Sequence, residues 1–127
     1  VVPCSPVRRE DHSGWMKEQN SWFEYDDDSK DGNELKYPEQ LLEQRSRLLR
    51  LLESERLRFP DCDGSRLMLW GLSQGVGIAI DVALRAPFAV GAVLALRGMA
   101  LPQAQLMDLP LQAERNHTVQ LLAINGT

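Results

Sequence analysis

The sequence has 127 residues, of which 43% are hydrophobic and 25% are charged, and its formal net charge is -4. This length allows one globular domain at most, and these proportions are ordinary for such a domain. The acidic balance gives no reason to expect binding to nucleic acid or to an anionic membrane surface. No apolar run approaches the roughly 20 residues that a membrane span requires.

The first 36 residues carry weak structural signals. Val1-Val2-Pro3-Cys4 is typical of the end of a short strand, and residues 7–36 are polar, rich in Gly and Asp, and without periodicity. The sequence therefore predicts a long loop over residues 7–36. The loop contains aromatic residues, among them Trp15 and Trp22. They could pack the loop against the body of the domain, or one of them could line an apolar acyl pocket.

Metal ligands are not grouped in this sequence. Asp27, Ser29, Asp31 and Gly32 fall on positions 1, 3, 5 and 6 of a calcium loop, but position 12 is Pro38 rather than the required Glu. We interpret the segment as a solvated acidic loop. We expect no metal and no cofactor.

The two cysteines, Cys4 and Cys62, have no metal-ligand spacing, and neither His12 nor His117 adds to them. Two free thiols indicate a reducing compartment. Since no signal peptide is recognisable, the sequence predicts a cytoplasmic protein.

Residues 37–57 are predicted to form an amphipathic helix. Pro38 suits the first turn, and acidic residues follow it at the positive end of the helix. The expected apolar stripe consists of Leu41, Leu42, Leu48, Leu49 and Leu52.

The most informative stretch, residues 66–87, reads RLMLWGLSQGVGIAIDVALRAP. A strand-like run leads into Gly71-x-Ser73-x-Gly75, and a helix-like run leads out. This spacing matches a nucleophile elbow, a sharp strand-to-helix turn that lifts a serine hydroxyl above the sheet. The glycines would avoid clashes in the tight bend, and the backbone N–H of Gln74 would point at a developing oxyanion. The alternative is a glycine-lined turn in which Ser73 simply caps the helix.

The rest of the chain predicts a parallel sheet. Val76 to Leu84 is an almost wholly apolar helix, in which Asp81 and Arg85 form one polar pair four residues apart. Gly75, Ala79 and Ala83 give it a flat face for close packing on strands. Apolar strands follow over residues 91–96 and 118–124. The order strand, helix, strand, loop, strand indicates an α/β fold with strands buried on both faces.

Together these residues resemble the phospholipase/carboxylesterase group of α/β-hydrolases, which includes the acyl-protein thioesterases. The resemblance is carried by Leu69-Trp70-Gly71-Leu72-Ser73-Gln74-Gly75, Ser21-Trp22-Phe23, Pro3-Cys4-Ser5-Pro6 and Ile124-Asn125-Gly126. It implies one partial α/β-hydrolase domain over residues 1–127, with a mostly parallel sheet and flanking helices but without the early strands and the C-terminal part. Residues 1–36 would be a strand end and a long loop, and residues 37–127 the helix, the elbow and two further strands.

The resemblance also implies site residues and substrates. Ser73 is similar to the nucleophile, Gln74 to an oxyanion donor through its backbone N–H, and Trp22 to an aromatic near the acyl groove. The implied activity is hydrolysis of carboxylic esters or thioesters, with acylated protein cysteines or lysophospholipids as substrates.

The acid and histidine of such enzymes would lie at position 129 and beyond, and the other oxyanion donor upstream of residue 1. As a fragment, the chain is therefore expected to be inactive. His117 would lie roughly 20 Å from Ser73, about seven residues away along a strand. His12 follows the first expected strand on the correct side of the sheet, but nothing fixes its geometry, and Asp108 without a base does little. The strand that bears this upstream donor lies beside the elbow strand in such enzymes. Without it, residues 67–70 would form an unpaired edge and residues 1–36 would be poorly ordered.

Two other interpretations stay open at this stage. A non-catalytic hydrolase-like module could bind a partner or a lipid through an exposed sheet edge and a partial acyl groove. An unrelated α/β domain could also contain the elbow pattern by accident.

Overall fold

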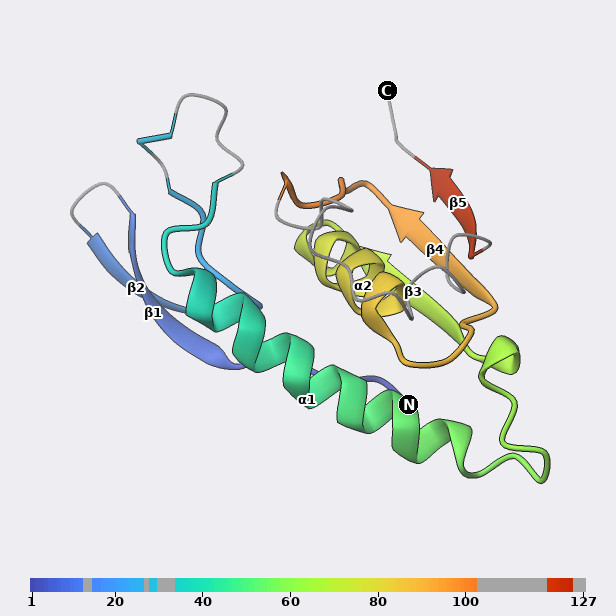
Figure 1. Cartoon of the computed structure of the whole chain (residues 1–127). Coiled ribbons are helices and arrows are strands. Elements are labelled where there is room, and N and C mark those ends of the chain that lie inside the picture. The colour runs from blue at the N-terminus through green and yellow to red at the C-terminus, as the bar shows by residue number, and fades with distance from the viewer. Residues whose placement is uncertain (13–14, 27, 30–33, 103–118, 125–127) are drawn as a thin grey trace.

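The computed structural model describes residues 1–12, 15–26, 28–29, 34–102 and 119–124. Within them the chain forms a two-stranded antiparallel sheet, a three-stranded parallel sheet and two α-helices. The fold is therefore mixed α/β, as predicted. Figure 1 shows the two sheets apart, with the long helix running from one toward the other.

The antiparallel sheet is a hairpin of β1 (Val7–His12) and β2 (Trp15–Asn20), with residue pairing from Val7↔Asn20 to His12↔Trp15. The predicted loop over residues 7–36 is therefore wrong for its first half. The predicted strand at residues 1–4 is also wrong, since residues 1–6 join no sheet. Both strands are mostly polar, so the apolar alternation that marks a strand is missing, although Ser13-Gly14 between them is a turn-favouring dipeptide.

Helix α1 (Pro38–Arg56) is confirmed and is one residue shorter at each end than predicted. Its buried leucines are Leu41, Leu48 and Leu52, whereas Leu42 is 52% exposed. The prediction was wrong for Leu42 because that residue lies about 100° around the helix from Leu41, away from the buried side.

The parallel sheet has the strand order β3-β4-β5, formed by β3 (Met68–Leu72), β4 (Ala92–Leu96) and β5 (Gln120–Ile124). Helix α2 (Gln74–Arg85) connects β3 to β4, as a crossover between parallel strands must. Within the described residues β3 is an edge strand, which agrees with the unpaired edge expected from the sequence.

The core lies on the two sides of α2. Toward α1, the helix contributes Ile78 and Val82 to a cluster with the buried leucines of α1. Toward the sheet, Ala79 and Ala83 pack with Val93 of β4. The small side chains allow the close approach that the sequence predicts.

The other face of the sheet is exposed in the described part of the chain. Met68, Trp70 and Leu72 of β3 are 66%, 69% and 60% exposed, and Leu122 and Ile124 of β5 are also exposed. Strands buried on both faces were therefore a wrong expectation. Side chains alternate across a strand, and α2 packs on the opposite face, toward which Leu69 and Val93 point.

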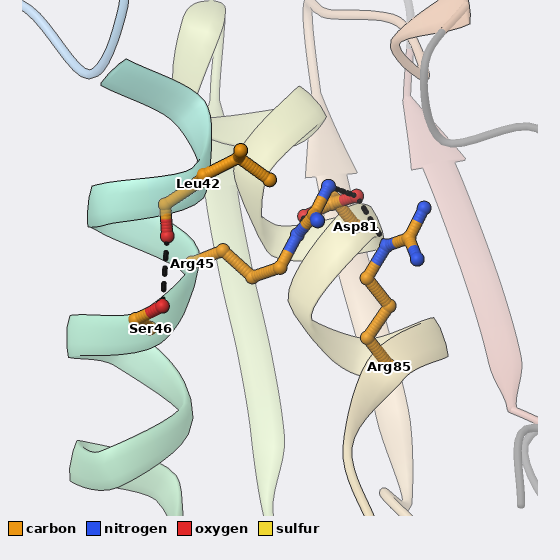
Figure 2. A network of polar contacts seen from close by, with 5 residues as sticks. All are labelled: Leu42, Arg45, Ser46, Asp81 and Arg85. Atoms are coloured by element: carbon orange, nitrogen blue, oxygen red, sulfur yellow. Dashed lines mark hydrogen bonds and ion pairs between the residues drawn. The ribbon is translucent and has the colours of Figure 1, made fainter. Parts of the chain in front are cut away.

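A buried ion-pair network joins the two helices, as Figure 2 shows. The carboxylate of Asp81 is fully buried and accepts hydrogen bonds from Arg45 of α1 at 2.7 and 2.9 Å. Arg85 donates a third at 3.0 Å, which confirms the predicted pair on α2. Two bonds in a fork-like geometry fix the separation of the helices as well as their charge balance.

We predict that Asp81→Asn lowers the free energy of unfolding by about 3 kcal/mol, because it leaves the largely buried guanidinium group of Arg45 without this counter-charge. Urea unfolding followed by circular dichroism measures this loss. Asp61→Asn is the matched control, since Asp61 pairs with Arg66 at 2.7 Å where both side chains are about half exposed. It should cost less than about 1 kcal/mol. Equal losses in the two variants would show that the buried network contributes nothing beyond a surface pair.

Candidate active site at the turn from β3 to α2

Ser73 is the only residue between β3, which ends at Leu72, and α2, which begins at Gln74. Its backbone has φ 52° and ψ -121°. A positive φ is uncommon for a residue with a side chain and costs roughly 1–3 kcal/mol. The sharp strand-to-helix turn predicted from the glycine–serine spacing is therefore present, with its strain at the serine.

The backbone of Ser73 is held from both sides. Its N–H donates to the carbonyl of Leu96 at the end of β4, at 2.9 Å, and its own carbonyl accepts from the N–H of Val76 at 3.0 Å. Gly98 packs against the same carbonyl, which a Cβ at that position would overlap. These contacts explain how the strained conformation persists.

The two glycines of the pattern differ in what they contribute. A Cβ on Gly71 would lie 2.6 Å from the Cα of Val76 and would overlap the carbonyl oxygen of Gly75. A Cβ on Gly75 would have its nearest neighbour, the indole Nε1 of Trp22, at an ordinary 3.7 Å. The expectation that both glycines avoid a clash is thus confirmed for Gly71 and wrong for Gly75.

The serine side chain is exposed and makes no capping hydrogen bond to the helix. Ser73 therefore lies at the N-cap position of α2 without the side-chain capping bond that the alternative interpretation expects. Its hydroxyl instead sits beside the positive end of α2. In that first turn the N–H groups of Gln74 and Gly75 have no intrahelical acceptor, so they are suited to an oxyanion.

Trp22 is brought to this turn by the side chain of Gln74. The Gln74 Oε1 atom accepts from the backbone N–H of Trp22 at 2.7 Å, and Nε2 donates to the carbonyl of Phe23 at 2.6 Å. Trp22 is half-buried, and its indole lies next to Gly75. The structure thus brings together the three residues singled out in the sequence.

The segment of residues 21–25, called the strap below, is fixed by further contacts. Arg8 of β1 donates to the carbonyls of Ser21 and Trp22 at 3.2 and 3.3 Å. Phe23 is fully buried in the core and meets the ring of Tyr25 edge to face, with centroids 5.4 Å apart. Burial raises the pKa of the Tyr25 hydroxyl above its ordinary value.

Gln40 of α1 also reaches the strap. Its Oε1 accepts from the N–H of Glu24 and its Nε2 donates to the Glu24 carboxylate, both at 2.9 Å. The roles of the Gln74, Gln40 and Arg8 side chains were not predicted from the sequence. Each side chain forms its hydrogen bond with a residue at least 13 positions away. The one available signal was a polar Gln74 at the start of an apolar helix.

Of the catalytic partners considered in the sequence, the structure describes only the backbone of His12. His12 ends β1 in the separate hairpin, so the expectation that it follows a first strand of the parallel sheet is wrong. His12 lies at one end of the hairpin, and Asn20, which leads into the strap, lies at the other. These ends are about 17 Å apart, because five residues at ~3.3 Å each separate them. His117 and Asp108 lie outside the described residues.

Comparison with known proteins assigns no family to this chain. No family model matches the chain, and the curated proteins searched gave no match either. In the described ranges, no group of three or more His, Cys, Asp or Glu residues could hold a metal ion. Neither described helix is long and apolar enough to cross a membrane.

We predict that Gly71→Ala lowers the free energy of unfolding by about 3 kcal/mol or prevents folding, because the atoms that its Cβ meets are backbone and cannot move aside. Gly75→Ala should be neutral or raise the stability by up to about 1 kcal/mol, because alanine favours the helix and its Cβ has room. Thermal and urea unfolding measure both. Similar losses in the two variants would contradict the unequal roles assigned to the glycines.

The strain at Ser73 gives a separate prediction. Ser73→Gly should be more stable than Ser73→Ala by about 1–3 kcal/mol, because glycine adopts a positive φ without steric cost and alanine keeps the clash. Urea unfolding of the two variants in parallel provides the measurement. A Ser73→Ala variant as stable as Ser73→Gly would mean that the turn carries no strain in solution.

Proposed function

We propose that this chain carries the nucleophile of a serine hydrolase of the α/β-hydrolase type, acting on carboxylic esters or thioesters. The observation that supports the proposal best is the backbone of Ser73, strained at φ 52°, with its side chain exposed at the first turn of α2. A plain connecting turn has no need of this strain, whereas a nucleophile elbow uses it to present the hydroxyl.

In the proposed reaction the Oγ atom of Ser73 attacks the acyl carbonyl carbon, and a general base takes the hydroxyl proton. The resulting oxyanion accepts a hydrogen bond from the backbone N–H of Gln74. The bond from the acyl carbon to the leaving oxygen or sulfur then breaks, and the alcohol or thiol departs with a proton. Water attacks the acyl-serine, releases the carboxylic acid and restores the Ser73 hydroxyl.

No described side chain is a candidate for the general base. The sequence resemblance would supply a histidine and an acid from beyond residue 127, and that part of the proposal rests on the resemblance alone. The same holds for the substrates, which would be acylated protein cysteines or lysophospholipids. The proposed reaction requires no cofactor, and the free thiols of Cys4 and Cys62 favour a cytoplasmic location. Trp22 would form an apolar wall for the acyl chain, which is consistent with its half-buried indole beside Gly75.

A non-catalytic binding module is the second candidate. It is favoured by the exposed apolar face of the parallel sheet, where Met68, Trp70 and Leu72 are each at least 60% exposed. Apolar patches of this kind are frequent in interaction sites. Such a module would have no need of a reactive Ser73 hydroxyl, so the reactivity of this serine separates the two candidates.

We expect a fluorophosphonate probe to label Ser73 in the full-length protein, in which the histidine and acid implied by the resemblance would activate the hydroxyl. The activated Oγ would displace fluoride from phosphorus, and the first-turn N–H groups would bind the phosphoryl oxygen as they would an oxyanion. Mass spectrometry of the labelled peptide identifies the site, and Ser73→Ala should abolish labelling.

The matched control for this experiment is Ser46→Ala. Ser46 is an exposed serine on α1 whose hydroxyl donates to the carbonyl of Leu42 at 2.9 Å, so it has no activating base. Its replacement should leave labelling unchanged. A folded protein that takes up no label, or takes it up equally well after Ser73→Ala, would rule out the hydrolase and favour the binding module.

A further inference from the structure

Gln74 combines two features that the proposed mechanism uses only in part. Its backbone N–H is the proposed oxyanion donor, and its side chain makes hydrogen bonds to two consecutive strap residues. We propose that the side-chain carboxamide of Gln74 is a positioning residue that holds the backbone N–H of the same residue in line with the oxyanion. This inference rests on the proposed function of Ser73.

The attachment is directional. Oε1 accepts from the N–H of Trp22 at 2.7 Å while Nε2 donates to the carbonyl of Phe23 at 2.6 Å. A group that accepts and donates at once in this way fixes both its position and the orientation of its plane. A carboxamide offers an acceptor and a donor on separate atoms without charge, and asparagine is one methylene too short to keep the same reach.

The strap is a firm anchor for this attachment. Phe23 is fully buried, and Arg8 holds the carbonyls of Ser21 and Trp22. The strap therefore does not follow a movement of Gln74. The two hydrogen bonds instead restrain the first turn of α2, which otherwise has the fewest backbone hydrogen bonds in the helix.

This restraint acts where the turn would relax. Rotation of the peptide between Ser73 and Gln74 changes ψ of Ser73, which is -121° here, and it would swing the Gln74 N–H away from the oxyanion. An oxyanion donor contributes only when it is held in place before the charge develops, and one such donor accounts for about 10²–10³-fold in kcat. Loss of the side-chain attachment should therefore lower kcat for every acyl group.

A different role for the same contacts would leave a different signature. If Gln74 only held the Trp22 indole as a wall for the acyl chain, its loss would raise KM, and it would do so for long acyl chains more than for short ones. The comparison of a short with a long ester therefore separates positioning of the donor from shaping of the pocket.

The experiment measures hydrolysis of 4-nitrophenyl acetate and 4-nitrophenyl octanoate by the full-length wild-type protein, with the histidine and acid implied by the resemblance, and by its Gln74→Met variant. Methionine keeps the length of the side chain and removes both hydrogen bonds. We expect kcat to fall about 10- to 100-fold for both esters, with KM changed less than about threefold. Gln40→Met is the matched control, since Gln40 makes the same kind of paired contact to Glu24, away from the turn. It should change kcat less than about threefold.

Gln74→Glu gives a second readout that a loss of folding cannot imitate. The ionised carboxylate cannot donate and would face the carbonyl oxygen of Phe23, whereas the protonated acid regains the donor. Because the neutral form is favoured there, the pKa of the new carboxyl should be raised. The kcat of Gln74→Glu relative to wild type should therefore increase as the pH falls through that raised pKa.

Each outcome decides the inference. An unchanged kcat in Gln74→Met, or a loss confined to the octanoate ester through KM, overturns the positioning role and leaves the hydrolase intact. If Gln74→Met does not unfold cooperatively in urea, a Gln74→Glu to wild-type kcat ratio that stays flat with pH overturns the role instead. Absence of Ser73-dependent hydrolysis in the wild-type protein overturns the proposed function and this inference with it.

Discussion

The passage from β3 to α2 through the single residue Ser73 is the constraint on which the rest of the structure depends. In this short reversal Ser73 has a positive φ, and a Cβ at Gly71 is excluded. It also directs α2 straight back over the sheet. There the small side chains of the helix allow close packing, and its opposite side forms the cluster with α1. The strain energy at Ser73 is small beside the free energy that this packing gains by burying apolar area.

Two polar residues on the otherwise apolar α2 decide what docks against it. Asp81 is fully buried and is matched by Arg45 of α1, while Gln74 is matched by the backbone of the strap. Apolar surface alone would tolerate several positions of α1 and of the strap. The buried carboxylate of Asp81 and the half-buried carboxamide of Gln74 tolerate only those that satisfy their hydrogen bonds, so these two side chains select one arrangement.

The same arrangement determines what chemistry the turn could support. The exposed hydroxyl of Ser73 and the first-turn N–H groups of α2 are groups that acyl transfer requires, and the indole of Trp22 adds an apolar surface beside them. The uncovered apolar face of the sheet is a second feature, and it belongs to the opposite side of β3 from α2. The binding and catalytic candidates thus rest on different faces of one edge strand.

The sequence by itself determined the local elements: α1 through its leucine spacing, the three parallel strands and α2 through their apolar runs, and the turn at Ser73 through its glycines. These follow from contacts within a few residues. The polar hairpin over residues 7–20 escaped detection, because its strands lack the apolar alternation that marks a buried face. Only the tertiary structure decided that Gln74 holds the strap, that Arg45 neutralises Asp81, and that one face of the sheet stays exposed. Those contacts join residues 36 to 52 positions apart, and no local pattern encodes which distant partner satisfies a buried polar group.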